Sequence, residues 1–412
     1  MKGVPGSPQG TVGYTDVMNA TTPAEVADAI RDARSSGTAL RLAGAGSWMD
    51  AGRAVQASRL LSLHGLRGIV EYVPGDLTLT ALAGTTLAEL DAATAAEGQW
   101  APLDPYGSPE GTLGATIATA SAGPLAGSSG RPRDAVLGIE AVLGQGDAVR
   151  VGGRVVKNVA GFDLVRLLTG SWGTLGAITH VTIRLRARAE LDVSTGFAAP
   201  DDAAALGEML ARLAALPVAP AACELLDPAL AAHLGLPMRT TLLMRLMGSR
   251  TSVDAAREAA RALGRPWETD TEVWNALRQG DPPGAATIRW SAGPAQLPRL
   301  WEAARIVAQP AGARTHASVL RGVVRQMAPA HNAVDLGAAW GALPSSLLPL
   351  EVSVVAERLP GSLWPVIAPS EVDDRLSRAV RQAFDPDYLL NPGIMGEDLP
   401  ELSIPLARTF DA

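Results

Sequence analysis

Two glycines directly after a predicted strand form the first candidate binding site. The segment "RLAGAGSWMDAG" covers residues 41–52, and Gly44 and Gly46 allow consecutive backbone N–H groups to face one anion, such as a pyrophosphate. A dinucleotide-binding fingerprint would need a third glycine where Met49 stands, and no Gly-Lys-Ser/Thr of a Walker A loop occurs. The loop therefore suits a phosphate without matching either nucleotide motif, and a plain turn is the alternative.

A second segment, residues 104–138, combines small side chains with hydroxyl groups. Small residues let the backbone lie against a flat ligand, and hydroxyls can bond the polar edge of a ring or a phosphate. The alternative is a close-packed helix beside a loop. The hydroxyl-bearing candidates are Thr112, Thr116, Thr119 and Ser121.

A third segment, "KNVAGFDLVRLLTGSWGTLGAITHVTIRLR", carries Gly170, Gly173 and Gly176 ahead of an alternating apolar strand. Glycine at every third position indicates that the backbone approaches another group closely. A fourth segment is the tail "DPDYLLNPGIM", in which Asn391 precedes a Pro–Gly pair.

Composition excludes several classes of protein. The chain has 35 Lys and Arg against 42 Asp and Glu, a net charge of −7, and no basic run, so we expect no nucleic-acid partner. Cys223 is the only cysteine, which excludes an intrachain disulfide and a CxxC zinc site, and the five histidines lie far apart, so no metal is expected. No signal peptide and no apolar run of roughly 18 residues is seen, so a cytoplasmic protein without a membrane span is expected.

Helix and strand signals alternate in the first half of the chain. Thr22, Pro23 and Glu25 predict the start of a helix that ends at Gly37, and a second capping box starts at Thr86. Strands are predicted at "ALRLA", "GIVEY" and "LTLTALA", and a hairpin is predicted to turn at residues 144–147.

Beyond residue 188 the sequence becomes rich in alanine-containing helices. A strand-then-helix unit, "TTLLMRLMGSRTSVDAAREAARALG", recurs in pattern as "ATIRWSAGPAQLPRLWEAARIV". Two such units predict an α+β cap, in which helices cover one face of an antiparallel sheet.

Read together, these segments resemble a known family. "RLAGAGS", "GTLGATIATASAGP…GRPRDAVLG", "KNVAGFDLVRLLTGSWGTLGAITHVTIRL" and "FDPDYLLNPGIM" resemble flavoproteins of the vanillyl-alcohol-oxidase and PCMH type, above all the FAD-binding subunit of glycolate oxidase. The resemblance covers about residues 15–188 and the tail. It implies an α+β protein with a PCMH-type FAD-binding domain of two α/β subdomains (1–188), a cap with an antiparallel sheet (189–384) and a tail returning to the flavin (385–412).

The resemblance also assigns cofactor residues by position. Lys157 and Asp163 occupy polar family positions with a structural role. The implied FAD-binding residues are Ala43, Gly44, Ala45, Gly46, Ser47, Pro105, Gly107, Thr112, Leu113, Gly114, Thr116, Ala122, Gly123, Arg133, Asp134, Gly173, Thr174, Gly176, Ile178, Thr179 and Asn391.

The sequence departs from the family pattern at three points that affect the expected cofactor site and active site. Trp172 stands where relatives often have Glu, and we expect its indole to pack outward, against the cap or a partner. The loop at 44–47 has no histidine for covalent attachment and Cys223 lies in the predicted cap, so FAD is expected to be non-covalent. The motif "GHxGDGNxH" of related dehydrogenases is absent, and His316 in "THASVLRGVVR" is its nearest trace.

His316 is therefore the one candidate catalytic residue, with a buried structural histidine as the alternative. Arg245, Arg289 and Arg321 are candidates to bind a substrate carboxylate from the cap strands, and ordinary ion-paired side chains are the alternative.

The resemblance implies oxidation of a 2-hydroxy acid such as glycolate or D-lactate, with FAD as the hydride acceptor. Electrons would pass to partners, a catalytic flavin subunit and an iron–sulfur subunit, through which the chain would sit at the periphery of the inner membrane. A non-catalytic FAD-carrying structural or electron-relay subunit is the main alternative, and an alditol- or sugar-lactone-type oxidase is a third.

Overall fold

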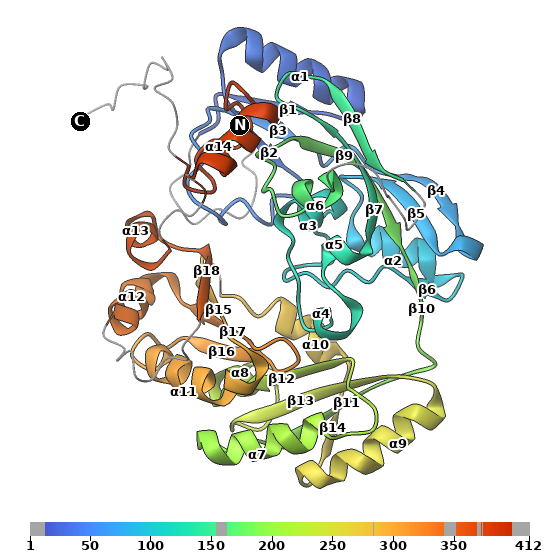
Figure 1. The fold of residues 1–412 in the computed structure, drawn as a ribbon, viewed down its shortest axis with the longest axis vertical. Helices are drawn as coiled ribbons and strands as arrows, with labels where there is room; N and C mark the ends of the chain where they lie inside the picture. The colour runs from blue at the N-terminus through green and yellow to red at the C-terminus, as the bar shows by residue number, and fades with distance from the viewer. Residues whose placement is uncertain are drawn as a thin grey trace.

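The chain folds into two lobes that face each other, an N-terminal lobe and a cap (Figure 1). The computed structural model describes residues 13–153, 163–282, 284–341, 352–368, 372 and 374–397. Lys157 lies outside the described residues.

The N-terminal lobe contains a three-stranded parallel sheet, ordered β1-β3-β2, and a five-stranded antiparallel sheet, ordered β4-β5-β9-β7-β8. A short pair, β10 and β6, completes it. Its strands are β1 (Asp16–Asn19), β2 (Leu40–Ala43), β3 (Arg59–Ser62), β4 (Ile69–Val73), β5 (Thr78–Leu82), β6 (Gln99–Trp100), β7 (Val136–Val142), β8 (Ala148–Gly152), β9 (Ala177–Arg184) and β10 (Arg186–Ala187). Its helices are α1 (Pro23–Ser36), α2 (Leu87–Ala95), α3 (Leu113–Thr119), α4 (Ala126–Ser129), α5 (Pro132–Ala135) and α6 (Leu164–Leu168).

The predicted helix starts are confirmed. Helix α1 begins with the complete capping box of Thr22 and Glu25 and ends at Gly37 with φ of 62°. Helix α2 begins with the same device at Thr86 and Glu89. The predicted hairpin is the antiparallel pair β7 and β8. Strands β1 and β3 were not predicted.

The cap is built on one eight-stranded sheet, ordered β14-β11-β13-β12-β16-β17-β15-β18. Its strands are β11 (Leu191–Ala198), β12 (Ala222–Leu226), β13 (Thr241–Gly248), β14 (Trp267–Thr269), β15 (Ala286–Ser291), β16 (Arg314–Ser318), β17 (Val323–Ala328) and β18 (Ser353–Arg358). Its helices are α7 (Ala203–Ala214), α8 (Pro228–His233), α9 (Arg250–Ala260), α10 (Glu272–Arg278), α11 (Leu297–Ala308), α12 (Ala333–Gly341) and α13 (Trp364–Ile367).

The two halves of this sheet have mirrored strand orders and meet at the antiparallel pair of β12 and β16. In each half, a helix follows the first strand and another follows the third, so the repeat starts at β11 and again at β15. The predicted repeat matched the unit of β13 and α9 with the unit of β15 and α11. In the structure, β13 is the third strand of the first half, whereas β15 is the first strand of the second half. Strand–helix units look alike locally, and only long-range pairing sets where a repeat begins.

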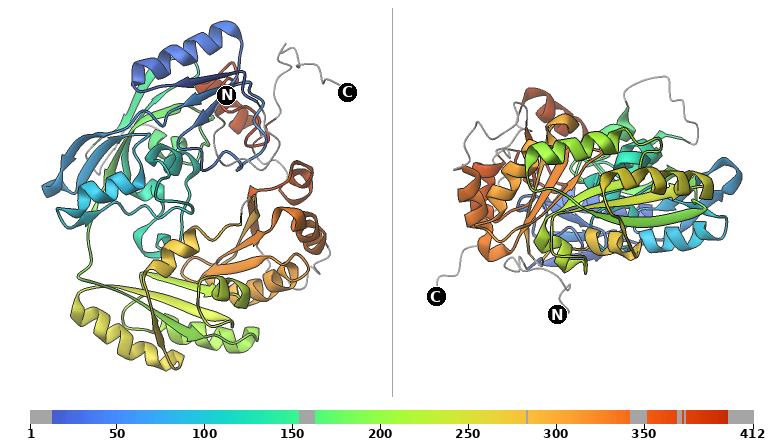
Figure 2. Two further views of the ribbon diagram at one scale, coloured as in Figure 1. Left: turned by 180° about the vertical axis from the view of Figure 1, so that it is seen from behind. Right: turned by 90° about the horizontal axis from the view of Figure 1, so that it is seen from below.

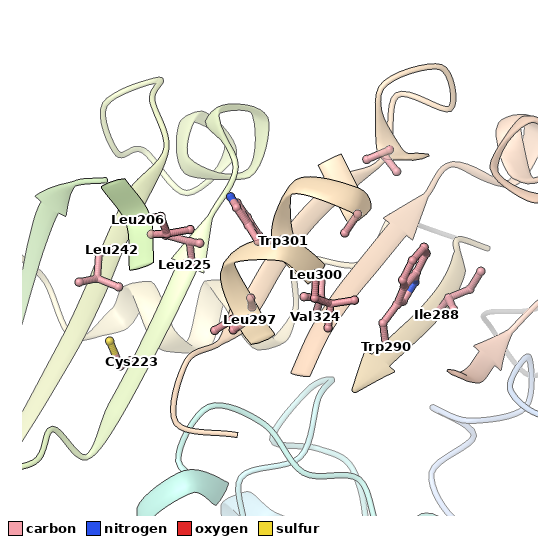
Figure 3. Packing of buried hydrophobic residues seen from close by; sticks show 14 of the residues in the cluster. Leu206, Cys223, Leu225, Leu242, Ile288, Trp290, Leu297, Leu300, Trp301 and Val324 are labelled. Atoms are coloured by element: carbon pink, nitrogen blue, oxygen red, sulfur yellow. The ribbon is translucent and has the colours of Figure 1, made fainter. Parts of the chain in front are cut away.

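The larger core of the cap lies between the sheet and helices α7, α9, α11 and α12, on the face turned away from the N-terminal lobe (Figure 2). Leu297, Leu300 and Trp301 of α11 point toward the strands (Figure 3). Cys223 lies in the same core, and burial raises the pKa of its thiol.

After the cap, the chain returns to the N-terminal lobe at α14 (Arg375–Phe384), earlier than the predicted boundary at 385. The side chain of Arg381 donates to the carbonyl oxygen of Thr174 at 2.5 Å. The N–H of Gly144 donates to the carbonyl oxygen of Phe384. No helix among the described residues is long and apolar enough to cross a membrane.

We expect Trp301→Ala to destabilise the cap by about 3–5 kcal/mol, because the indole is 1% exposed and its removal leaves a large cavity. Circular dichroism during urea unfolding measures the change. Ile306→Ala is the matched control on the same helix, since Ile306 is 47% exposed, and should change the free energy of unfolding by less than about 0.5 kcal/mol. Equal effects of the two substitutions would contradict the packing of α11.

Candidate cofactor site

One cavity of about 700 Å³, including its opening to solvent, lies in the N-terminal lobe. The loop after β2, helix α3, the turn before β9 and the C-terminal tail surround it. Three predicted segments and the tail, which lie far apart in sequence, thus meet around one space. The predicted cofactor residues that line it are Ala43, Gly44, Gly46, Ser47, Thr112, Gly114, Gly173, Gly176, Ile178 and Asn391.

The loop after β2 presents free backbone donors. Within the described part of the chain, the N–H groups of residues 44–48 donate no hydrogen bond to another protein group. Gly46 has φ of 84°, a left-handed conformation that turns successive N–H groups toward one side. Such a run of unpaired donors is suited to an anion with several oxygens, such as a pyrophosphate.

Arg41 is a cavity residue that the sequence analysis did not single out. Its side chain is 5% exposed and lines the cavity, and Nη1 has no hydrogen-bond partner in the described structure. Burial lowers the pKa of Arg41, partly offset by Tyr14 and Asp50. A buried guanidinium with a free donor next to the loop is complementary to a phosphate. The sequence does contain a signal for this residue, because Arg41 is a charged residue within an apolar strand directly before the two glycines.

Two glycines are required by close contacts around the cavity. A Cβ on Gly44 would collide with Oγ1 of Thr112, the residue that caps α3. A Cβ on Gly173 would stand 2.9 Å from Nδ2 of Asn391, and φ there is 71°. The predicted close approach is therefore partly an approach of protein segments to one another.

Asn391 fastens the tail to both walls of the cavity. Its Oδ1 accepts from the N–H of Leu42 at 2.7 Å, and its Nδ2 donates to the carbonyl oxygen of Trp172 at 2.7 Å. The side chain is 4% exposed. Its φ of 48° is left-handed, a region that asparagine tolerates better than most residues.

The expectation that Trp172 packs outward is wrong. Its side chain lines the cavity and meets Trp48 edge-to-face, with ring centroids 5.9 Å apart. The residue has φ of 55°, so the turn directs the indole inward instead of along the strand. Neither this φ nor the partner Trp48 is visible in the glycine spacing.

The other predicted cofactor residues do not line the described cavity. For them, as for the residues that line it, the contact with FAD stays a prediction. Some have structural contacts: Leu113 is fully buried in the core, and the hydroxyls of Thr116, Thr174 and Thr179 donate to backbone carbonyls. Arg133 and Asp134 are about half exposed. The remaining residues are Ala45, Pro105, Gly107, Ala122 and Gly123.

His316 lies in the cap, away from the cavity lining, but it faces the N-terminal lobe. Its Nδ1 is 2.7 Å from Oε2 of Glu224, and both side chains are buried. Its ring centroid lies 5.7 Å from that of Tyr106, which belongs to the N-terminal lobe. In the described structure Nε2 of His316 has no partner.

The three candidate arginines have different surroundings. Arg245 forms a two-pronged ion pair with Asp192 at 2.6 and 2.9 Å, and Arg289 pairs with Glu357 at 3.0 Å. Arg321 donates to the carbonyl oxygens of Ala122 and Gly123, and it has no carboxylate partner among the described residues. Of these three arginines, Arg321 alone has no anionic partner in the part of the chain that the structure describes.

Comparison with known proteins identifies the class of this fold and site. Residues 16–152 match the model of an FAD binding domain. Alkyldihydroxyacetonephosphate synthase has the same fold, with a TM-score of 0.66 and 15% identity over 91% of this chain and 75% of that one. The protein is a flavoprotein with a PCMH-type FAD-binding fold. The free N–H groups at 44–48 and the free Nη1 of Arg41 fit the phosphates of FAD.

Sequence relatives narrow the class. Glycolate oxidase subunit GlcE of Escherichia coli is 35% identical over 61% of this chain and 66% of its own length. Glycolate oxidase subunit GlcD of Bacillus subtilis is 33% identical over 50% of this chain and 45% of its own, and a D-lactate dehydrogenase of Archaeoglobus fulgidus is 46% identical over 25% and 23%. The chain is similar to FAD-linked oxidoreductases of the glycolate oxidase and D-lactate dehydrogenase family, and its matches span less than two thirds of the length of each of these relatives.

We expect Asn391→Gly to weaken FAD binding by about tenfold or more, because the N–H of Leu42 and the carbonyl of Trp172 lose their buried partner. Glycine keeps the left-handed φ, so the change isolates the amide. Titration of the apoprotein with FAD measures the affinity.

Asn332→Gly is the matched control, because it removes an amide donor to the carbonyl oxygen of Ala311 in the cap. It should leave FAD affinity unchanged. If Asn391→Gly binds FAD as well as the control does, the tail amide does not shape the cofactor site.

Proposed function

We propose that this chain is an FAD-dependent oxidoreductase subunit that oxidises a small 2-hydroxy acid, such as glycolate or D-lactate, with non-covalent FAD. The electrons pass to partner subunits, a catalytic flavin subunit and an iron–sulfur subunit. The names of the relatives support the substrate class. One observation carries the catalytic role: a cap histidine oriented by a buried carboxylate faces the N-terminal lobe at Tyr106. The charge of Arg321, which has no anionic partner among the described residues, also acts on Tyr106.

His316 has the arrangement of a proton acceptor. If Nδ1 carries the proton donated to Glu224, Nε2 keeps its lone pair and faces outward from the pair. Oxidation of a hydroxy acid requires removal of the hydroxyl proton, while bound FAD supplies the hydride acceptor. Tyr106 connects this region to the cofactor lobe, since its N–H donates to Oγ of Ser121, shortly after cavity residue Thr119.

Arg321 is the best-placed partner for a substrate carboxylate. Arg131 lies near it, and after burial itself the charge of Arg321 is the largest cause that lowers the pKa of Arg131; the charges of Arg133 and Arg289 lower that pKa further. Guanidinium groups that repel one another gain from an added anion. This positive region adjoins Ala122 and Gly123, which belong to the predicted cofactor segment.

Anaerobic addition of glycolate or D-lactate to the FAD-loaded protein should bleach the flavin absorbance, because the hydroxy acid transfers a hydride. L-lactate serves as the stereochemical control, and an alditol and a sugar lactone test the third candidate activity on the same fold. A flavin spectrum that no hydroxy acid alters, with or without partner subunits, would contradict the proposed activity.

His316→Gln should slow flavin reduction by about 100-fold or more while FAD affinity stays unchanged. Stopped-flow absorbance measures the rate, and FAD titration measures the affinity. His180→Gln is the matched control, because Nδ1 of His180 also contacts a carboxylate, Oε2 of Glu140 at 3.2 Å, on a sheet of the N-terminal lobe. Equal reduction rates in both variants would remove His316 from the chemistry.

A second candidate function is an FAD-carrying electron-relay subunit without its own substrate. The ion pairs of the cap arginines favour this relay function. Arg325 is paired with both Asp281 and Glu357, so the carboxylate of a substrate would have to compete with these two carboxylates for Arg325. In this case the flavin is reduced only after the catalytic partner and its substrate are added together.

A further inference from the structure

We propose that Arg358, the last residue of cap strand β18, is a positioning residue for FAD: it holds the loop after β2 in its binding shape, so the docked cap retains the cofactor. This proposal rests on the assignment of residues 44–48 as the phosphate-binding loop.

Arg358 reaches from the cap to three groups of that loop. Its Nε donates to Oδ1 of Asp50 at 3.0 Å, and its Nη2 lies 3.4 Å from the carbonyl oxygen of Ser47. The guanidinium stands 4.7 Å from the ring centroid of Trp48, a cation–π contact. Trp48 and Ser47 both line the cavity, so the cap side chain acts directly on the cavity wall.

Further cap contacts fix the end of the same loop. The N–H of Gly52 donates to the carbonyl oxygen of Glu357 at 2.9 Å. Arg53 donates to the carbonyl oxygen of Ala368 at 2.5 Å and lies over the ring of Trp364. In the anion-binding half of the loop no N–H group donates an internal hydrogen bond among the described residues, and only the carbonyl oxygens of Gly46 and Trp48 accept bonds from nearby residues of the same lobe. The contacts from the cap therefore add to a loosely bonded segment.

The partner of Arg358 inside the cap links the loop to the candidate catalytic region. Asp281 accepts from Arg358 at 3.4 Å and from Arg325 at 2.5 and 2.7 Å. Arg325 is the register neighbour of His316 in the sheet. Burial raises the pKa of Asp281, but Arg325 and Arg358 outweigh it and hold that pKa below its usual value, so Asp281 stays ionised. A ligand that displaces Asp281 would therefore also change the hold of Arg358 on the loop.

The test is the rate of FAD release from the full-length holoprotein, followed by the rise of flavin fluorescence on dilution. Arg358→Gln should release FAD at least about tenfold faster, because it loses charged hydrogen bonds and the cation–π contact. Arg358→Lys should restore part of the retention, since it keeps the charge near Asp50 but loses the planar fork. Melting of the apoproteins separates this effect from general destabilisation.

Arg245→Gln is the matched control. Arg245 lies in the same sheet, has a similar side-chain exposure of 17% against 13%, and pairs with Asp192 near the ring of Trp274. It should lower apoprotein stability as much as Arg358→Gln does but leave FAD release unchanged. Equal release rates in the two variants would overturn the proposal.

Two further variants keep the test decisive. If Arg358→Gln does not fold, Asp50→Asn removes the loop partner while the cap charges remain, and it should also speed FAD release. Gly44→Val tests the loop assignment itself, because its side chain collides with Thr112. If Gly44→Val binds FAD normally, the loop assignment fails; if it loses FAD while Arg358→Gln and Asp50→Asn retain it, only the role of Arg358 fails.

Discussion

The shape of the cofactor cavity depends on one buried amide. Asn391 satisfies the N–H of Leu42 and the carbonyl of Trp172, residues that lie 349 and 219 positions away in the chain. Each of these backbone groups would otherwise be left in a place that water reaches poorly, at a cost of about 1–3 kcal/mol. The amide has a donor and an acceptor on one rigid plane, so it fixes the distance between the end of β2 and the turn before β9. The cavity walls are therefore complete only when the tail has returned to the N-terminal lobe.

A second constraint is the charge buried between the lobes. Arg325 stands opposite Arg289 on one neighbouring strand and His316 on the other, so three nitrogenous side chains share one sheet face. Burying an unpaired ion costs several kcal/mol, and Glu357 on β18 and Asp281 before β15 offset that cost. A slip of β18 by one residue would turn Glu357 to the opposite face and leave two arginines without it. The ion pairs thereby fix the register of the edge strand.

Local signals in the sequence predicted what local physics determines. Capping boxes at Thr22 and Thr86 need only neighbouring residues, and the glycine contacts at 44 and 173 follow from the absence of a Cβ. Strands β1 and β3 were missed because each has four residues and forms by parallel pairing with a distant segment. Strand β2 is equally short, but the Gly-Ala-Gly loop directly after it marked its position. Trp172 was misplaced because its direction depends on a left-handed φ and on Trp48, and the role of Arg41 became apparent only once the cavity beside it was known.

The arrangement of charges divides the cap arginines by task. Arg289, Arg325 and Arg358 face Asp50, Asp281 and Glu357, so this group is balanced and joins the cap to the loop without attracting an anion. Arg321 lies outside that balance and contacts only neutral carbonyl oxygens in the described structure. Arg321 is thus the one of these four arginines whose charge is open to an added anion, and it acts on Tyr106, the ring that His316 also contacts. A substitution at Arg321 can thus change the attraction of an anionic ligand without changing the contacts of Arg358 that attach the cap to the loop.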